Sequence, residues 1–290
     1  MRWRIVMAYA VLYLVWGSTY FAMKIAVTSL PAFLTAASRF FFSGAVLCAI
    51  GLWTSKQRPT WSHLQAGALQ GLLLMVLGNA SVMWAMKTMP SGVGALIVAT
   101  TPLFMALFTN DHRRTTWIGL FVGVTGIAVL VEPWGQVAVV PWQGALVLVM
   151  AAAAWAAGSL VPRHLSVHPS NALATGLPML VGAVVQAVIG VAMDERLEQA
   201  TVTSEAVGAV VYLAIFGSLL GFSAYGWLLR VEPATRVSTY AFVNPVVAVV
   251  LGAVVGGEPI SSRLVLAMAL ILAAVVLIMR PSSTSAKPRR

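Results

Sequence analysis

Residues 78–108, GNASVMWAMKTMPSGVGALIVATTPLFMALF, and residues 221–251, GFSAYGWLLRVEPATRVSTYAFVNPVVAVVL, are two copies of one pattern. They align without a gap, so that Gly78 falls on Gly221 and Pro102 falls on Pro245. Each copy reads as an apolar helix, a short turn with one base and one proline, and a second apolar helix that contains a proline. The sequence therefore predicts a duplicated pair of membrane helices, which is typical of transporters built from repeats.

The composition indicates that lipid is the main solvent of this chain. Of its 290 residues, 60% are hydrophobic and only 9% are charged, whereas soluble domains carry about 25% charged residues. The net charge of +10 does not indicate nucleic acid as a partner, because the bases lie in short segments between apolar runs. The single cysteine, Cys48, can form no intrachain disulfide.

Ten apolar stretches are candidates for membrane spans, since a bilayer core of about 30 Å needs about 20 apolar residues per helix. The sequence thus predicts an all-α integral membrane protein with ten transmembrane helices. The expected spans are 5–26, 33–53, 64–86, 92–109, 117–131, 143–160, 172–193, 206–229, 237–255 and 264–279.

The distribution of bases predicts the orientation of these spans. With the N-terminus inside, thirteen Lys and Arg residues fall in inside segments and four in outside segments, while Arg39 lies within the second span. This bias places both termini in the cytoplasm. Six of the eight acids fall outside. The last ten residues, 281–290, are expected to form a disordered basic cytoplasmic tail.

The two halves of the chain match beyond the duplicated pair. Trp16 falls on Trp155, and eight residues later Lys24 falls on Arg163. Each half holds five spans, and because five is odd the second half enters the membrane from the opposite side. We therefore expect two inverted repeats, at residues 1–137 and 138–280. Such repeats place a binding site near the midplane, and rocking about it gives alternating access.

No pattern of catalytic, metal or cofactor residues is found in the sequence. The four histidines have no metal-ligand spacing, and there is no Gly-rich phosphate loop. We expect neither an enzyme nor a cofactor. Proton coupling stays open, and because no paired carboxylates lie mid-span it would use Glu258, Glu132 or Asp111 near helix ends.

Arg39 is the most unusual residue, because it lies about 9 Å into the second span at 1.5 Å per residue. An ionisable residue inside a span is a candidate counter-charge for a substrate carboxylate or phosphate. The alternative is that it reaches back to the outer interface or caps carbonyls of a neighbouring helix. We favour this alternative on the sequence alone.

Polar groups beside the two interior prolines are further candidates. A proline leaves a carbonyl one turn back without its partner and disfavours helix at the preceding residue, so each site can break its helix and expose polar backbone to a cavity. Packing alone is an equally good explanation. The residues of this prediction are Thr100 and Thr101 before Pro102 and Asn244 before Pro245, with the two prolines as helix breaks. Asn79, the other asparagine within a span, joins the expected substrate pathway because a buried amide must find partners in another helix or in a ligand.

Aromatic residues within the spans are candidates for the wall of a pocket. Trp16, Tyr20 and Trp155 lie beside small residues, a combination that suits an aromatic-lined cavity with a few polar groups. Tyr225 and Tyr240 are added to the expected substrate pathway. The alternative for each of them is tight helix packing through small residues.

Four runs together resemble the EamA family of the drug/metabolite transporter superfamily: WGSTYFAMKIAV from Trp16, SRFFFSG from Ser38, PSGVGALIVATTPLF from Pro90, and TYAFVNPVVAVVLGAVVGGEPIS from Thr239. The resemblance covers almost the whole chain. It implies ten helices, cytoplasmic termini and export of small metabolites. It also implies a central cavity lined by the first, third, fourth, sixth, eighth and ninth helices.

These observations predict a multi-pass transporter of a bacterial inner membrane that exports small organic metabolites, amino acids or lipophilic drugs. Few charges are expected in its cavity, which disfavours highly charged substrates such as sugar phosphates. The alternative is a membrane helper subunit or lipid-interacting scaffold that transports nothing. The substrate, the coupling ion and the oligomeric state stay open.

Overall fold

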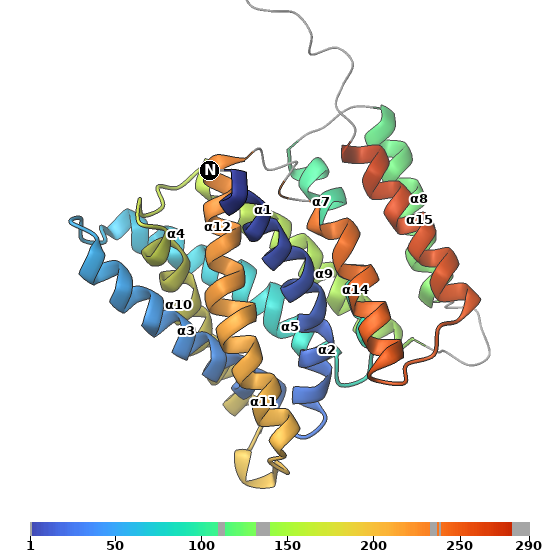
Figure 1. The fold of residues 1–290 in the computed structure, drawn as a ribbon, viewed down its shortest axis with the longest axis horizontal. Helices are drawn as coiled ribbons and strands as arrows, with labels where there is room; N and C mark the ends of the chain where they lie inside the picture. Colours follow the sequence, from blue (N-terminus) through green and yellow to red (C-terminus); the bar gives the residue numbers. More distant parts are fainter. Residues whose placement is uncertain (1, 110–113, 132–139, 233–236, 238, 280–290) are drawn as a thin grey trace, which may run out of the picture.

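The computed structural model describes residues 2–109, 114–131, 140–232, 237 and 239–279, and within these ranges it contains helices and no strands (Figure 1). The expected tail at 281–290, and Asp111 and Glu132, lie outside the described residues. The α-helices are α1 (Arg2–Ala10), α2 (Trp16–Val27), α3 (Ala32–Thr54), α4 (Trp61–Gln70), α5 (Ser81–Ala85), α6 (Ser91–Val98), α7 (Thr101–Phe108), α8 (Arg114–Val131), α9 (Trp142–Leu160), α10 (Asn171–Ala192), α11 (Ser204–Tyr212), α12 (Gly221–Val231), α14 (Tyr240–Val254) and α15 (Ser262–Met279).

Several α-helices join end to end through wider π-helical turns. The π-helical segments are Val11–Val15 between α1 and α2, Gly71–Ala80 between α4 and α5, and Leu213–Leu220 between α11 and α12. Two of them, Gly71–Ala80 and Leu213–Leu220, lie at or just before the starts of the two sequence copies. Such wide turns are frequent at functional sites, because they loosen the regular ladder of backbone hydrogen bonds.

Among the described residues, seven continuous helices are long and apolar enough to cross a membrane. They correspond to the first four and to the sixth, seventh and eighth expected spans. The other three expected spans coincide with shorter apolar stretches: Arg114–Leu130, Val243–Val254 and Ser262–Leu277. The all-helical membrane class is confirmed.

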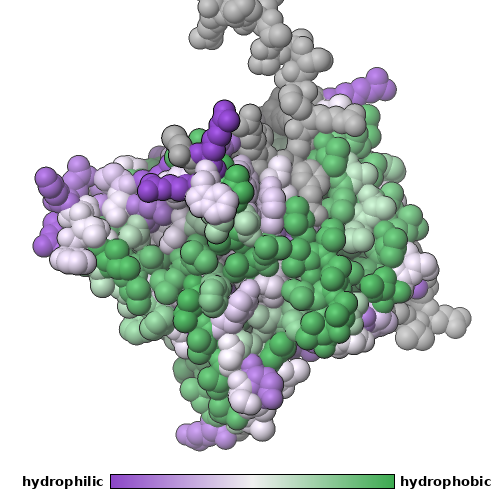
Figure 2. Space-filling model, in the orientation of Figure 1, coloured by the Kyte–Doolittle hydropathy of each residue, from purple (hydrophilic) through white to green (hydrophobic). Residues whose placement is uncertain are grey.

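The surface of the molecule is apolar over a broad band. Figure 2 shows hydrophobic side chains across the middle of this face and hydrophilic ones gathered toward its two ends. Trp3, Trp53, Trp61, Trp117 and Trp142, which lie near the ends of the expected spans, are all exposed. Exposed tryptophans at the edges of an apolar band are typical of membrane–water interfaces.

Helices from the two sequence halves pack against each other throughout the structure. The most extensive contacts join α3 to α10, and α8 to α15. Helix α2 packs on α11 and α14, while α9 packs on the segment Gly71–Ala80, on α6 and on α7. The first and sixth expected spans therefore make matching sets of contacts with the opposite half.

Acidic side chains cap two helices at one end of the bundle, which we call the acidic end. Glu195 accepts hydrogen bonds from the backbone N–H groups of Ala32 (3.0 Å), Phe33 (2.9 Å) and Leu34 (3.0 Å) at the start of α3. Its carboxylate also lies 3.4 Å from the ammonium of Lys87. A carboxylate at a helix N-terminus satisfies N–H groups that have no partner within the helix.

Glu258 forms the second cap at the acidic end. Its Oε1 accepts from the Ser91 N–H (2.8 Å), and its Oε2 accepts from the Ser91 hydroxyl (3.0 Å) and from the Gly92 N–H (3.4 Å). Lys24 donates to the Met86 carbonyl oxygen nearby, at 2.9 Å. The two glutamates thus tie α6 and α3 to chain segments of the other half.

The opposite end of the bundle, which we call the basic end, holds the N-terminus and the connection between α9 and α10 (Figure 1). Arg230 donates to the carbonyl oxygens of Pro169 and His168 there. The Ser170 N–H donates to His168 Nδ1 (3.0 Å), and His168 Nε2 lies 3.3 Å from the Gln57 carbonyl oxygen. Because Nδ1 accepts the Ser170 N–H, the His168 imidazole is neutral in this arrangement, and burial lowers its pKa.

The interior prolines of the two sequence copies, Pro102 and Pro245, act differently. Helix α6 ends at Val98, α7 begins at Thr101, and Pro102 occupies the first turn of α7. The expected break at Pro245 is wrong, because α14 continues through it from Tyr240 to Val254. A proline removes its own N–H from the helix ladder and crowds the carbonyl group one turn back, which kinks or breaks a helix; α14 continues despite this.

The Asn244 side chain adds hydrogen bonds next to Pro245. With its amide nitrogen turned toward carbonyl groups, it donates to Tyr240 (3.2 Å), Leu12 (3.1 Å) and Tyr13 (3.3 Å). Leu12 and Tyr13 belong to the π-helical segment Val11–Val15. The amide therefore ties α14 to the wide turn of the first span and supports an unbroken helix.

Candidate functional site

A pocket lies between the two sequence halves and is lined by residues of both. It contains about 610 Å³ of space, part of it open to solvent. Eight of the ten expected pathway residues line it. The lining residues are Trp16, Thr19, Tyr20, Met23, Arg39, Gly78, Asn79, Val82, Val98, Thr101, Ala151, Trp155, Gly217, Phe222, Tyr240 and Asn244.

Trp16 is the centre of an aromatic cluster on the pocket wall. Its ring centroid lies 5.6 Å from that of Trp155, with the planes nearly perpendicular, and 5.4 Å from that of Tyr240. Phe222 and Tyr225 each lie 5.2 Å from it. The Trp16 indole N–H donates to the Gly217 carbonyl oxygen (3.1 Å) within a π-helical segment. These contacts fix the indole plane, so the wall is rigid and aromatic.

Two glycines make room for the two tryptophans, and each belongs to the other half of the chain. A Cβ on Gly221 would lie 2.3 Å from Trp16 Nε1, and a Cβ on Gly78 would lie 3.1 Å from Trp155 Cε3. Gly78 and Gly221 correspond in the sequence copies, as do Trp16 and Trp155. Each half thus contributes a tryptophan that packs on a glycine of the other half.

Arg39 of α3 points into the pocket, and only 2% of its surface is exposed. Its guanidinium donates to the Asn79 side-chain oxygen and lies 4.4 Å from the Phe40 ring centroid, while its Nε has no hydrogen-bond partner. The expectation that Arg39 reaches the interface is wrong. Asn79 lies in the π-helical segment of the neighbouring span and gives the guanidinium an inward acceptor.

The remaining expected residues divide between the pocket and its surroundings. Tyr20, Thr101, Tyr240 and Asn244 line the pocket. Thr100 is buried, its hydroxyl donates to the Ile97 carbonyl oxygen (2.6 Å), and it is not among the lining residues. The hydroxyl of Thr101 donates to the Val98 carbonyl oxygen (2.8 Å) at the break before α7.

A second cavity lies toward the basic end, and we call it the vestibule. It contains about 950 Å³ and is lined by polar and basic side chains as well as apolar ones, among them Ser159, Arg163, Asn171, Thr175 and Arg230. Phe222 lines both the vestibule and the pocket. Tyr225 lines the vestibule and contacts Trp16. The rings of Phe222 and Tyr225 therefore separate the two cavities.

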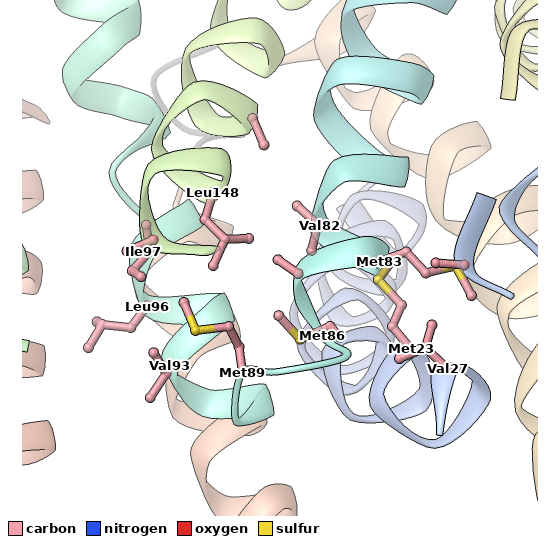
Figure 3. Packing of buried hydrophobic residues seen from close by; sticks show 14 of the residues in the cluster. Met23, Val27, Val82, Met83, Met86, Met89, Val93, Leu96, Ile97 and Leu148 are labelled. Atoms are coloured by element: carbon pink, nitrogen blue, oxygen red, sulfur yellow. The ribbon is translucent and has the colours of Figure 1, made fainter. Parts of the chain in front are cut away.

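The acidic end of the pocket is closed by buried side chains rich in methionine. Met23 lines the pocket, and Met83, Met86 and Met89 lie beyond it with no exposed surface. Figure 3 shows these four methionines packed with Val93, Leu96, Ile97 and Leu148 where α2, α5, α6 and α9 meet. Methionine is unbranched and adaptable, so this closure can repack without losing its apolar contacts.

Phe222 is a pocket residue that sequence reasoning missed, although the repeat alignment carries its signal. It stands opposite Asn79 when the two copies are aligned, and both residues line the pocket. The second span, α3, also lines the pocket through Arg39. The family resemblance did not include this helix in the cavity wall. Among the described residues, no group of three or more metal-ligating side chains is found.

The arrangement suits reversible binding of a small amphipathic solute, because it combines an aromatic wall, one guanidinium and two amides. The EamA-like transporter family matches residues 3–132 and again residues 142–280. The chain belongs to this family. It is therefore a membrane transporter of the drug/metabolite transporter superfamily, and the resemblance noted in the sequence is confirmed.

Relatives with similar sequences carry consistent descriptions. The uncharacterized inner membrane transporter YedA of Escherichia coli (strain K12) is 38% identical over 273 residues, which cover 92% of this chain and 88% of YedA. The uncharacterized transporter YvbV of Bacillus subtilis is 23% identical over 93% of this chain and 89% of its own length. These names point to transport and away from catalysis.

A solved crystal structure has a similar fold. It superposes with a TM-score of 0.67, covers 96% of this chain and 98% of its own, and is 22% identical. At this identity the likeness extends to the fold alone.

Proposed function

We propose that this family member is a secondary transporter of a bacterial inner membrane that exports small organic solutes by alternating access through the central pocket. The observation that carries the proposal is the pocket itself, which is enclosed by residues from both sequence halves. Binding sites of repeat-built transporters lie at such an interface. Metabolites, amino acids and lipophilic drugs are the solute classes that a mainly apolar, aromatic cavity suits.

The underlying architecture in this proposal is ten spans arranged as two inverted five-helix repeats, residues 1–137 and 138–280, followed by a cytoplasmic tail at 281–290. Three features support it. The family matches each half separately. The tryptophan of each half packs on the corresponding glycine of the other half. The first and sixth spans make matching contacts with the opposite half.

Reciprocal polar contacts also relate the halves. Ser43 of α3 donates to the Ala214 carbonyl oxygen (2.9 Å), and Gln186 of α10 donates to the Met75 carbonyl oxygen (2.7 Å). Ser43 and Gln186 are separated by the same interval as the two sequence copies. Each acceptor lies in a π-helical segment of the opposite half.

Alternating access requires that the pocket be closed toward one side of the membrane in one state and open toward that side in the other state. The vestibule adjoins the pocket on the side of the basic end, with the Phe222 and Tyr225 rings between them, whereas the methionine cluster and the two glutamate caps close the acidic end. The excess of bases supports a cytoplasmic position for the basic end, and YedA is described as an inner membrane transporter. Export as the physiological direction rests on the family resemblance.

The test is flux into proteoliposomes of the purified chain, measured with amino acids and lipophilic cations, with and without a proton gradient. We expect saturable flux of at least one compound and its loss in Trp16→Ala. Trp53→Phe, a change at an exposed interfacial tryptophan, serves as the matched control and keeps flux. A response to the gradient would identify proton coupling. Absence of flux, together with a fixed co-purifying protein, would favour the helper-subunit alternative.

A further inference from the structure

Arg39 is the one ionisable group with a formal charge among the described residues that line the pocket. Its Nε has no partner, and no ion pair to Arg39 is found among the described residues. Arginine stays protonated in proteins, so the charge is permanent. A buried charge without a counter-ion is costly. In the binding pocket of a transporter, such an uncompensated cation can pair with an anionic solute.

The neighbours of Arg39 leave its charge uncompensated. Asn79 contributes an amide oxygen, which accepts a hydrogen bond but carries no formal charge. The Phe40 ring, 4.4 Å from the guanidinium carbon, contributes only its quadrupole. Together these groups orient the guanidinium. A planar guanidinium with free N–H groups matches the two oxygens of a carboxylate.

The charged side chains that line the vestibule are positive, like Arg39 in the pocket. Arg163 and Arg230 line the vestibule, and no Asp or Glu is among the described residues that line either cavity. Cavities lined by charges of one sign raise the local concentration of the opposite ion. An anion approaching from the vestibule therefore meets attractive charges along the path to Arg39.

The opposite wall of the pocket is apolar, and it limits the number of negative charges that a bound solute can carry. Trp16, Trp155 and Tyr240 offer ring faces and edges to the body of a solute, and Met23 and Val82 add apolar surface. A single guanidinium compensates one negative charge, and a second charge on the solute would be buried without a partner.

We propose that the pocket selects organic monoanions: a carboxylate bound by Arg39 on a body with an apolar or aromatic end that packs on the tryptophan wall. This inference rests on the proposed transport function and names the substrate class of the same site. Simple aromatic carboxylates have this chemistry.

The experiment compares three probes of one shape and different charge. The probes are 3-phenylpropanoate, its neutral amide and 3-phenylpropylamine, and their affinities for the purified full chain in detergent are measured by titration calorimetry at pH 7. We expect the carboxylate to bind about tenfold more tightly than the amide, because hydrogen bonds to a charged group are stronger than those between neutral groups. Because this comparison uses the unmodified protein, it does not depend on the folding of a variant.

Variants then assign the preference to the guanidinium. Arg39→Gln is expected to weaken carboxylate binding about tenfold or more and to leave amide binding unchanged, whereas Arg39→Lys keeps part of the preference. Arg196→Gln, a change at an exposed arginine of the acidic end, is the matched control and changes neither affinity.

The outcomes separate this inference from the transport proposal. Equal binding of carboxylate and amide, tightest binding of the amine, or binding of none of the probes would overturn the selectivity for monoanions. A carboxylate preference that survives in Arg39→Gln would overturn the role of Arg39. The transport proposal stands or falls separately, on flux of any compound of the proteoliposome panel.

Discussion

At the scale of single residues, the pocket depends on small side chains that let large ones take up their positions. Gly221 is the clearest case, because the Trp16 indole occupies the space that any side chain there would need. The same indole donates to Gly217 and contacts Trp155, Tyr240 and Phe222. One glycine thus decides where the central aromatic residue lies.

Gly221→Ala is expected to displace the Trp16 indole and to break its hydrogen bond to Gly217. Overpacking of this kind costs about 1–3 kcal/mol, so the apparent unfolding temperature in detergent and the saturable flux should both fall. Gly208→Ala lies in the same span, where a Cβ meets nothing within 4 Å, and should leave both unchanged. A Gly221→Ala protein as stable and as active as the unmodified chain would contradict the role of this contact.

At the scale of helices, the ends of α3 and α6 are held by carboxylates from distant parts of the chain. Glu195 reaches three N–H groups of α3, and Glu258 reaches the first residues of α6. Both caps lie at the acidic end, beyond the methionine cluster. Opening this end for release of a solute requires the helices to separate from these caps.

Neutralising the caps is expected to shift the protein toward opening at the acidic end. A charged cap at a helix N-terminus contributes about 1 kcal/mol more than a neutral one, so Glu195→Gln and Glu258→Gln should favour separation severalfold. The reporter is Val98→Cys, a pocket position, in a Cys48→Ala background. Its labelling rate by an impermeant thiol reagent is measured from each side of the membrane.

The control for this experiment is Glu198→Gln, because Glu198 is exposed in the same connection as Glu195. Faster labelling from the acidic side in the two cap variants, with no change in the control, is the expected result. Unchanged or slower labelling in both cap variants would mean that the caps only stabilise the fold.

At the scale of the whole molecule, the arrangement of the helices brings alternate connections to opposite ends. The connection after α3 and the connection after α9 meet at the basic end, through His168 and Gln57. The turn after α2 and the segment around Glu195 meet at the acidic end. In the proposed orientation the basic end faces the cytoplasm.

Single cysteines in the Cys48→Ala background test that orientation. Cysteines at Ser55 and His164 are expected to react with an impermeant thiol reagent only in inverted membrane vesicles, and cysteines at Thr28 and Glu198 only in intact spheroplasts. Each position lies outside the long helices, so substitution should not disturb a span. The reverse pattern would invert the proposed topology, and a mixed pattern would contradict the ten-span arrangement.

The sequence by itself determined the membrane class, the duplication and the family, because lipid requires long apolar helices and a repeat leaves corresponding residues at a fixed interval. It also indicated eight pocket residues, since polar and aromatic side chains within apolar spans need partners. Only the tertiary structure decided the rest. Arg39 turns inward because Asn79 of a neighbouring span accepts from it, and α14 stays unbroken at Pro245 where the Asn244 amide bridges to the first span. Contacts between distant segments, which no local pattern records, set both outcomes.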